Sequence, residues 1–235
     1  MSESAHGSIQ NLRVALDRIH ERIARAAERA GRNRDEVTLV AVSKTFPVDL
    51  LQAAIRAGVK DLGENRAQEL REKARALGNA ARWHFVGPLQ TNKVRLVVGT
   101  AQLIHSVDRI ELAEVISKRA SAVGTKQHVL IEINTSGESN KHGAQPADAM
   151  RLAERANALD KVVVDGLMTM APFSEEPETS RPFFKQLAHL QDEVASVVPS
   201  AVHLSMGMSR DFEIAIEEGA TIVRVGEAIF GSRAH

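Results

Sequence analysis

The sequence predicts a single (β/α)8 barrel of the TIM type, an α/β fold, preceded by an extra N-terminal helix. Three observations favour this fold: short apolar runs alternate with longer helical stretches, the apolar runs number eight, and no proline- or serine-rich linker divides the 235 residues. Eight consecutive βαβ units are what closes a barrel. An open doubly wound sheet is the structural alternative. Residues 1–235 are therefore assigned to one domain.

The first expected element is an amphipathic helix over residues 8–30. Apolar residues recur there at mostly helical spacing, Arg and Glu fill the positions between them, and Gly31 ends the pattern. Residues 1–8 stand outside this pattern, and we expect them to be disordered.

Eight strands and seven intervening helices follow in alternation. The strands are expected within residues 37–45, 59–65, 82–89, 102–108, 127–136, 162–171, 201–209 and 220–231. The helices are expected within residues 47–58, 66–77, 90–99, 109–124, 145–160, 177–198 and 210–219. Two long connections rich in turn residues, 137–146 and 171–180, are expected to be mobile.

The composition excludes several classes of function. Lys plus Arg and Asp plus Glu balance at 30 each, so there is no overall basic field that would attract nucleic acid or an anionic membrane. The absence of cysteine excludes disulfides, thiolate zinc sites and cysteine nucleophiles. No segment approaches the roughly 18 apolar residues of a membrane span, and the nine histidines show no metal-ligand spacing. We expect a cytoplasmic protein with a small-molecule or protein partner and without a metal.

In barrels of this kind the chemistry lies at the carboxyl ends of the strands. Alternation along a strand places every second side chain on one face. One face of the first strand carries Val40, Val42 and Lys44, and one face of the last strand carries Ile222, Arg224 and Gly226. Because barrel closure makes these two strands neighbours, we expect Lys44 and Arg224 to meet at the mouth of one pocket.

Two adjacent cations need an anionic partner, or one of them must lose its charge. The pKa of a lysine falls readily on burial, and the neutral amine can then form an imine. The residues alone leave two interpretations of Lys44 open. It is either an imine-forming lysine or half of an ion pair with Glu64 or Glu132.

The loops after the last two strands have features of a phosphate site. Ser205 offers a hydroxyl, Gly207 permits close approach of the backbone, and a short helix begins near Ser209. Gly226 and the amides after it add a second segment of this kind. Phosphate sites in these two loops are common in this fold, whereas ordinary turn glycines are the alternative interpretation.

The order of several motifs resembles a known family. Between residues 9 and 233 the chain contains AVSKT, GENRAQE, WHFVGPLQTNK, HSVD, GLMTM, HLSMGMSRDFEIAIEEG and VRVGEAIFG. It resembles the pyridoxal phosphate homeostasis protein family, also called proline synthetase co-transcribed proteins, which are single-domain barrels similar to the N-terminal domain of alanine racemase.

The resemblance implies pyridoxal 5'-phosphate (PLP) as cofactor, with Lys44 as its Schiff-base lysine and Arg224 facing the pyridine nitrogen. A guanidinium at that nitrogen keeps it unprotonated, which makes the ring a poor electron sink. The remaining residues that the resemblance assigns to cofactor binding are Asn65, Met168, Ser205, Met206, Gly207, Gly226 and Glu227. Many relatives have Thr or Ser at position 227, and strand parity turns the Glu227 side chain outward.

The function implied by the resemblance is intracellular PLP (vitamin B6) homeostasis, in which the protein buffers or delivers the cofactor without turnover of its own. No catalytic residue is therefore assigned. Racemisation by the alanine racemase route uses a tyrosine from a second domain opposite the lysine, and this chain has no tyrosine. A PLP-dependent amino-acid racemase-like enzyme and a barrel isomerase acting on a phosphorylated metabolite are the alternatives. We expect a monomer, with PLP-dependent apo-enzymes as candidate recipients.

Overall fold

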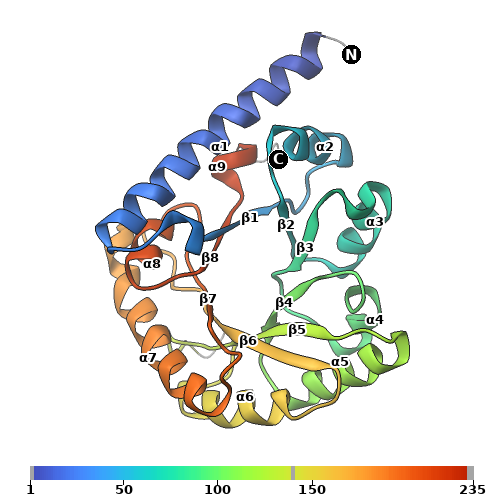
Figure 1. Ribbon diagram of the computed structural model, residues 1–235, viewed down its shortest axis with the longest axis vertical. Coiled ribbons are helices and arrows are strands. Elements are labelled where there is room, and N and C mark those ends of the chain that lie inside the picture. Colours follow the sequence, from blue (N-terminus) through green and yellow to red (C-terminus); the bar gives the residue numbers. More distant parts are fainter. Residues whose placement is uncertain (1–2, 139–140, 232–235) are drawn as a thin grey trace.

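The strands form one closed parallel barrel in the order β1-β2-β3-β4-β5-β6-β7-β8 (Figure 1). The computed structural model describes residues 3–138 and 141–231. Its strands are β1 (Thr38–Val42), β2 (Asp61–Glu64), β3 (Arg82–Phe85), β4 (Leu103–Val107), β5 (Gln127–Glu132), β6 (Val162–Met168), β7 (His203–Ser205) and β8 (Ile222–Val225). The closed barrel is confirmed over the open sheet. Residues 139 and 140, within the first loop expected to be mobile, lie outside the described residues.

A helix lies in each of the seven connections between strands, as predicted. These helices are α2 (Val48–Ala57), α3 (Ala67–Leu77), α4 (Val94–Val97), α5 (Ile110–Val123), α6 (Ala149–Asn157), α7 (Arg181–Val197) and α8 (Phe212–Glu217). Short 3-10 turns occupy Arg34–Glu36, Gly78–Ala80, Thr91–Lys93, Pro146–Asp148 and Pro177–Ser180. The end of the last predicted strand is instead a one-turn helix, α9 (Glu227–Phe230), that begins after Gly226.

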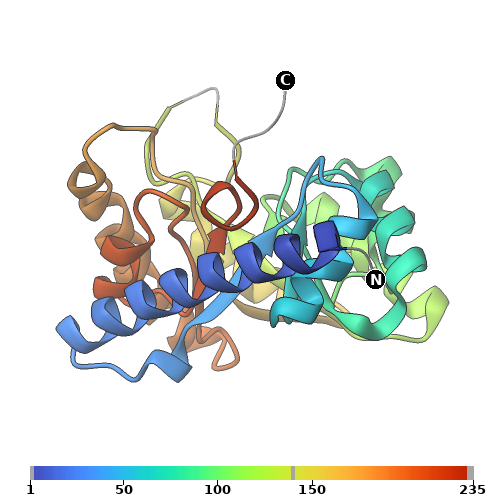
Figure 2. The same ribbon diagram turned by 90° about the horizontal axis from the view of Figure 1, so that it is seen from above.

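The extra N-terminal helix, α1 (Glu3–Arg29), runs along one side of the barrel against α2, α8 and α9 (Figures 1 and 2). Its apolar face is buried, and two arginines pair with α8, Arg22 with Glu213 at 2.6 Å and Arg29 with Glu217 at 2.7 Å. Residues 3–8, expected to be disordered, are helical, because a helix anchored by packing extends at one backbone hydrogen bond per residue. Met1 and Ser2 lie outside the described residues.

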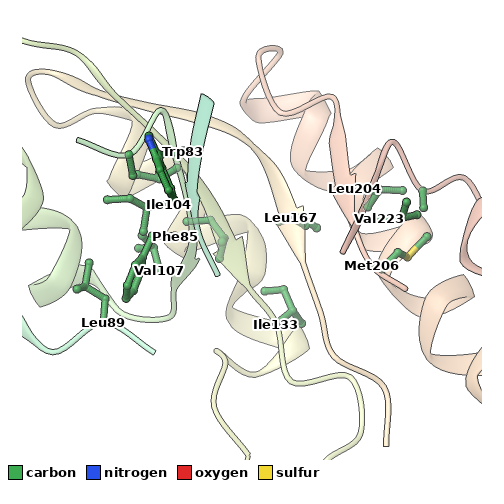
Figure 3. Close-up of a cluster of buried hydrophobic side chains, with 14 of the residues drawn as sticks. Trp83, Phe85, Leu89, Ile104, Val107, Ile133, Leu167, Leu204, Met206 and Val223 are labelled. Atoms are coloured by element: carbon green, nitrogen blue, oxygen red, sulfur yellow. The ribbon is translucent and has the colours of Figure 1, made fainter. Parts of the chain in front are cut away.

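Two apolar layers hold the barrel together. The inner layer lies inside the barrel and consists of Val40, Leu103, Leu130, Met168 and Ile222. The outer layer lies between strands and helices, where Figure 3 shows residues such as Trp83, Phe85 and Ile104. Burial of each large apolar side chain contributes about 1.5–3 kcal/mol. The two largest pockets described below lie at the ends of the barrel.

Candidate functional site

A pocket of about 560 Å³ opens at the carboxyl ends of β1 and β8. The loop between β6 and α7 and the loop between β7 and α8 complete its walls. Lys44 and Arg224 both line this pocket, and β1 pairs directly with β8. The predicted meeting of the two cations at one pocket is confirmed. The volume is within the range that small-molecule ligands occupy. We call this pocket the mouth site.

Glu64, one ion-pair partner that the sequence offered for Lys44, is paired with Lys73 instead. Lys73 Nζ lies 2.7 Å from Glu64 Oε1 and 3.0 Å from Glu69 Oε2. Burial raises the pKa of Glu64, although hydrogen bonds from Lys73 and Ser43 oppose the shift. Sequence reasoning missed Lys73, although its i+3 spacing from Leu70 places it on the buried face of α3.

This buried cluster holds the backbone on both sides of Lys44. Lys73 Nζ donates to the Ser43 carbonyl oxygen at 2.9 Å, and the Thr45 amide donates to Glu69 Oε2 at 3.0 Å. Thr45 has a φ of +71°, in the left-handed region. Such a conformation costs a residue with a β-branched side chain about 1–3 kcal/mol and persists only where the surroundings impose it. Contacts within the protein therefore fix the conformation of the main chain on both sides of Lys44.

Arg224 is 4% exposed and makes two hydrogen bonds inside the barrel. Its Nη1 donates to Ser205 Oγ at 2.6 Å and its Nη2 to the Thr169 carbonyl oxygen at 2.9 Å. Burial lowers the pKa of Arg224 to about 10, although Glu132 and Asp211 raise it. The guanidinium therefore remains charged at neutral pH while it faces the pocket.

A chain of hydrogen bonds leads from Arg224 through the barrel interior. His105 Nδ1 lies 2.9 Å from Ser205 Oγ, His105 Nε2 lies 3.0 Å from His84 Nδ1, and His84 Nε2 lies 3.1 Å from Asp61 Oδ1. Burial, then the charges of His84, Arg224 and His203, lower the pKa of His105 well below its usual range. With Asp61 as the terminal acceptor, each group donates toward Asp61, so the Ser205 oxygen is free to accept from Arg224.

Glu132 is the other partner that the sequence offered for Lys44. It is 3% exposed at the end of β5. Burial and then the charge of Asp108 raise the pKa of Glu132 to about 7, against the opposing effect of Arg224. The carboxyl group therefore changes its protonation close to neutral pH.

Two glycines bring backbone segments close to the mouth site. Gly207 has a φ of +88°, and a Cβ there would lie 2.6 Å from the Cβ of Ala215 in α8. A Cβ at Gly226 would lie 3.1 Å from the Val42 carbonyl oxygen. The amides of Ser209, Arg210 and Glu227 at the pocket edge donate no hydrogen bond to a protein group in residues 3–138 and 141–231. These amides and the Ser209 hydroxyl could receive an anion.

The structure brings four of the nine predicted cofactor residues to the mouth site: Lys44, Arg224, Gly226 and Glu227. Glu227 is exposed as the first residue of α9. Asn65 is half-buried at the end of β2, and its Oδ1 is buried without a hydrogen-bond partner among the described residues.

The other four are buried away from the pocket lining. Met168 belongs to the inner apolar layer, and Met206 and Gly207 pack beneath the loop before α8. Ser205 points into the barrel toward Arg224 because it occupies an inward position of β7. Ser209, four residues later, is the hydroxyl that lines the pocket; its place in the loop before α8 is the sequence signal for it.

An aromatic wall of the mouth site was also not predicted. Phe46 and Phe173 line the pocket, and the Arg210 guanidinium lies 4.9 Å from the centroid of the Phe173 ring. Within the described residues no group of three or more His, Asp or Glu side chains could hold a metal ion. No helix in that part of the chain is long and apolar enough to cross a membrane.

Comparisons with known proteins show the family of this chain. The profile of the family described as "Alanine racemase, N-terminal domain" matches residues 14–234. A "Pyridoxal phosphate homeostasis protein" of Aquifex aeolicus is 48% identical over 220 residues, 93% of this chain and 96% of that protein. The protein of the same name from Escherichia coli K12 is 40% identical over 224 residues, 93% and 95% of the two chains.

Solved structures show the same fold. A structure described as that of "an unknown protein from Bifidobacterium adolescentis" superposes with a TM-score of 0.90 at 38% identity, over 98% of this chain and 97% of that one. PipY of Synechococcus elongatus, solved with PLP bound, gives a TM-score of 0.78 at 34% identity, over 91% of this chain and 100% of that one. An alanine racemase of Clostridium difficile, at 18% identity and a TM-score of 0.74, shares the fold over 58% of its length. The chain belongs to the pyridoxal phosphate homeostasis protein family, within the alanine racemase N-terminal domain family.

Proposed function

We propose that this protein holds PLP in the mouth site through Lys44 and serves intracellular PLP homeostasis as a carrier without turnover of its own. The observation that carries the proposal is the joint presence of Lys44 and Arg224 in one pocket of small-molecule size. The names of the relatives and the PLP bound to PipY support it. PLP supplies an aldehyde that condenses reversibly with a neutral amine.

Lys44 would provide that amine. Its position at the end of β1 is held by the hydrogen bonds that Lys73 and Glu69 make to its two neighbours. The Lys44 side chain is half-buried, so it remains accessible to a cofactor that enters from solvent.

Arg224 would contact the ring nitrogen and the loop amides would hold the phosphate. Because Arg224 has a pKa of about 10, it keeps its protons at neutral pH and would leave the ring nitrogen without one. The Ser209 hydroxyl and the amides of Ser209, Arg210 and Glu227 are donors suited to phosphate oxygens. The unpartnered Asn65 Oδ1 lies on the strand next to that of Lys44 and would line the ring.

The proposal of a carrier without turnover rests on what faces Lys44. An unprotonated ring nitrogen weakens the ring as an electron sink, and the chain has no tyrosine to act as a second base. The Asp211 carboxylate at the pocket is already engaged, since it accepts hydrogen bonds from the Met208 amide and the Ser180 hydroxyl. We further propose a monomer that passes its cofactor to apo-enzymes.

An absorbance spectrum with a racemase assay tests the proposal. The purified protein should be yellow, the Lys44→Ala variant should be colourless, and a matched Lys60→Ala variant, changed at an exposed lysine, should stay yellow. Incubation with D- or L-amino acids should give no racemisation. Colourless protein that takes up no added PLP would contradict the binding proposal, and sustained racemisation would favour the enzyme alternative.

A further inference from the structure

A second depression, a groove of about 900 Å³, lies at the opposite end of the barrel, beside the amino ends of β3 and β5. Helices α3 and α5 contribute its two sides, and α4 lies between them (Figure 1). The helix α4 has only 4 residues, whereas α3 has 11 and α5 has 14. The groove lies beside this short helix, which contributes Arg95 and Leu96 to its lining. We call it the basic groove.

The charge of the basic groove has one sign. Six cationic side chains line it and no Asp or Glu does; they are Arg71, Arg75, Arg82, Arg95, Arg119 and Lys126. Arg82 is neutralised by Asp61 at 2.6 Å. The other five form no salt bridge with any residue in the described part of the chain. The carboxyl ends of α3 and α5 contribute about −0.5 charge each, which leaves about four positive charges uncompensated.

Two buried donors in the same groove have no protein partner. The indole Nε1 of Trp83 and the Nε of Arg119 are buried, and neither makes a hydrogen bond within residues 3–138 and 141–231. Trp83 is 4% exposed and packs in the outer apolar layer, with its nitrogen at the end of the cluster away from Leu89 (Figure 3). Unsatisfied buried donors are rare in folded proteins and indicate a missing polar partner.

The floor of the basic groove is braced from within. The Gln127 side-chain amide donates to the carbonyl oxygens of Ala101 and His128 at 3.1 Å each, which ties the loop after α4 to the start of β5. These contacts fix the loop that carries Gly99 and Thr100 into the groove. The floor of the basic groove is therefore held in place by hydrogen bonds, and the cationic side chains surround it.

We propose that the basic groove binds a small molecule with a triphosphate chain, either a nucleoside triphosphate or inorganic tripolyphosphate. Guanidinium groups match phosphate oxygens with two parallel hydrogen bonds. One phosphate monoester carries about −2 and would leave half of the positive charge uncompensated. A triphosphate chain compensates it, and the groove volume is at the upper end of the range for small-molecule sites. This ligand site is separate from the mouth site and does not depend on the proposed PLP binding.

The single tryptophan of the chain is a built-in reporter for this proposal. Because Trp83 lines the groove, titration of the full-length protein with sodium tripolyphosphate should change tryptophan fluorescence saturably at low salt. Binding should be at least tenfold tighter than that of orthophosphate and should weaken as the salt concentration rises. ATP serves as the second probe; binding as tight as that of tripolyphosphate assigns recognition to the phosphates, and tighter binding adds recognition of the nucleoside.

A pair of charge-matched variants locates the binding. Arg75→Gln with Arg95→Gln removes two exposed groove cations and should weaken tripolyphosphate binding at least tenfold. Arg13→Gln with Arg18→Gln makes the same charge change on exposed positions of α1 and should leave binding unchanged. Thermal unfolding curves identify any variant that fails to fold. If the groove double variant fails to fold, the single groove variant Arg71→Gln takes its place.

Several results would overturn the proposal. They are the absence of a saturable fluorescence change, equal weakening in the two double variants, and orthophosphate binding as tight as that of tripolyphosphate. A structured RNA that binds more tightly than tripolyphosphate, and loses that binding in the groove variant, would replace the small molecule with nucleic acid as the ligand.

Discussion

The two ends of the barrel carry positive charge in different ways. At the mouth site Lys44 and Arg224 stand among acidic groups, with Glu132 and Asp211 close enough to shift the pKa of Arg224. The basic groove is lined by cationic side chains and by no carboxylate. The first arrangement balances charge inside the protein and adjusts proton affinities, whereas the second leaves the balance to a ligand. The comparison separates the proposed PLP site, where charges are balanced within the protein, from the proposed anion site, where they are not.

The largest expected effect comes from Lys73→Met, which leaves Glu64 buried without its partner. Loss of one member of a buried ion pair typically costs about 3–5 kcal/mol, here in free energy of unfolding. Retention of PLP should fall as well, because the Ser43 carbonyl oxygen loses its bond from Lys73, and Glu69, which accepts from the Thr45 amide, loses its own bond from Lys73. Chemical denaturation and the absorbance of bound PLP measure the two effects.

Matched variants sharpen this prediction. Arg66→Met removes a salt bridge to Glu69 from a side chain that is 70% exposed, so it should cost less than about 1 kcal/mol. Adding Glu64→Gln to Lys73→Met should restore part of the stability, since no unpaired charge is then buried. Tripolyphosphate binding at the basic groove should not change in any of these variants; a parallel loss there would mean that the two ends are not independent.

Glu132→Gln should change how stability depends on pH. The folded pKa of Glu132 is about 7, above the unfolded value of 4.5, so the folded state binds the extra proton and its stability falls as pH rises through this window. Relative to the variant, the wild-type apo-protein should lose up to about 3 kcal/mol between pH 4 and pH 8. Parallel stability curves for the two proteins over this window would contradict the raised pKa.

The smallest effects compare the two described non-glycine residues with positive φ, one at each end of the barrel. Thr45→Gly and Lys161→Gly should each alter stability by less than about 1 kcal/mol, because relief of strain is offset by the entropy of glycine. Only Thr45→Gly should weaken retention of PLP, since Thr45 adjoins Lys44. Equal retention in both variants would show that the strained turn does not position the lysine.

The sequence could predict the mouth site because strand alternation is a local pattern. The parity of β1 and β8 was enough to bring Lys44 and Arg224 together. Ser205 was predicted as a phosphate ligand from its hydroxyl and its place before Gly207, and in the structure this hydroxyl accepts a hydrogen bond from Arg224. Lys73 was missed because its partners Glu64 and Ser43 come from neighbouring strands, and only the fold brings them to α3.

The basic groove was hidden for a different reason. Equal numbers of acidic and basic residues in the whole chain excluded an overall basic field, yet Arg71, Arg95 and Lys126 lie in separate segments that the barrel gathers at one end. The length of α4 was also overestimated, since the apolar run before Gly99 does not show where a helix stops. Net charge describes the chain, whereas binding depends on where the charges meet.

Reduction with borohydride followed by peptide mapping tests the central claim most directly. Treatment of the yellow protein should fix one PLP group per chain, and mass spectrometry should place it on the peptide that contains Lys44. The Lys44→Ala variant should retain none after the same treatment. Modification concentrated on another lysine, such as Lys126 in the basic groove, would contradict the account that PLP is held at the mouth site.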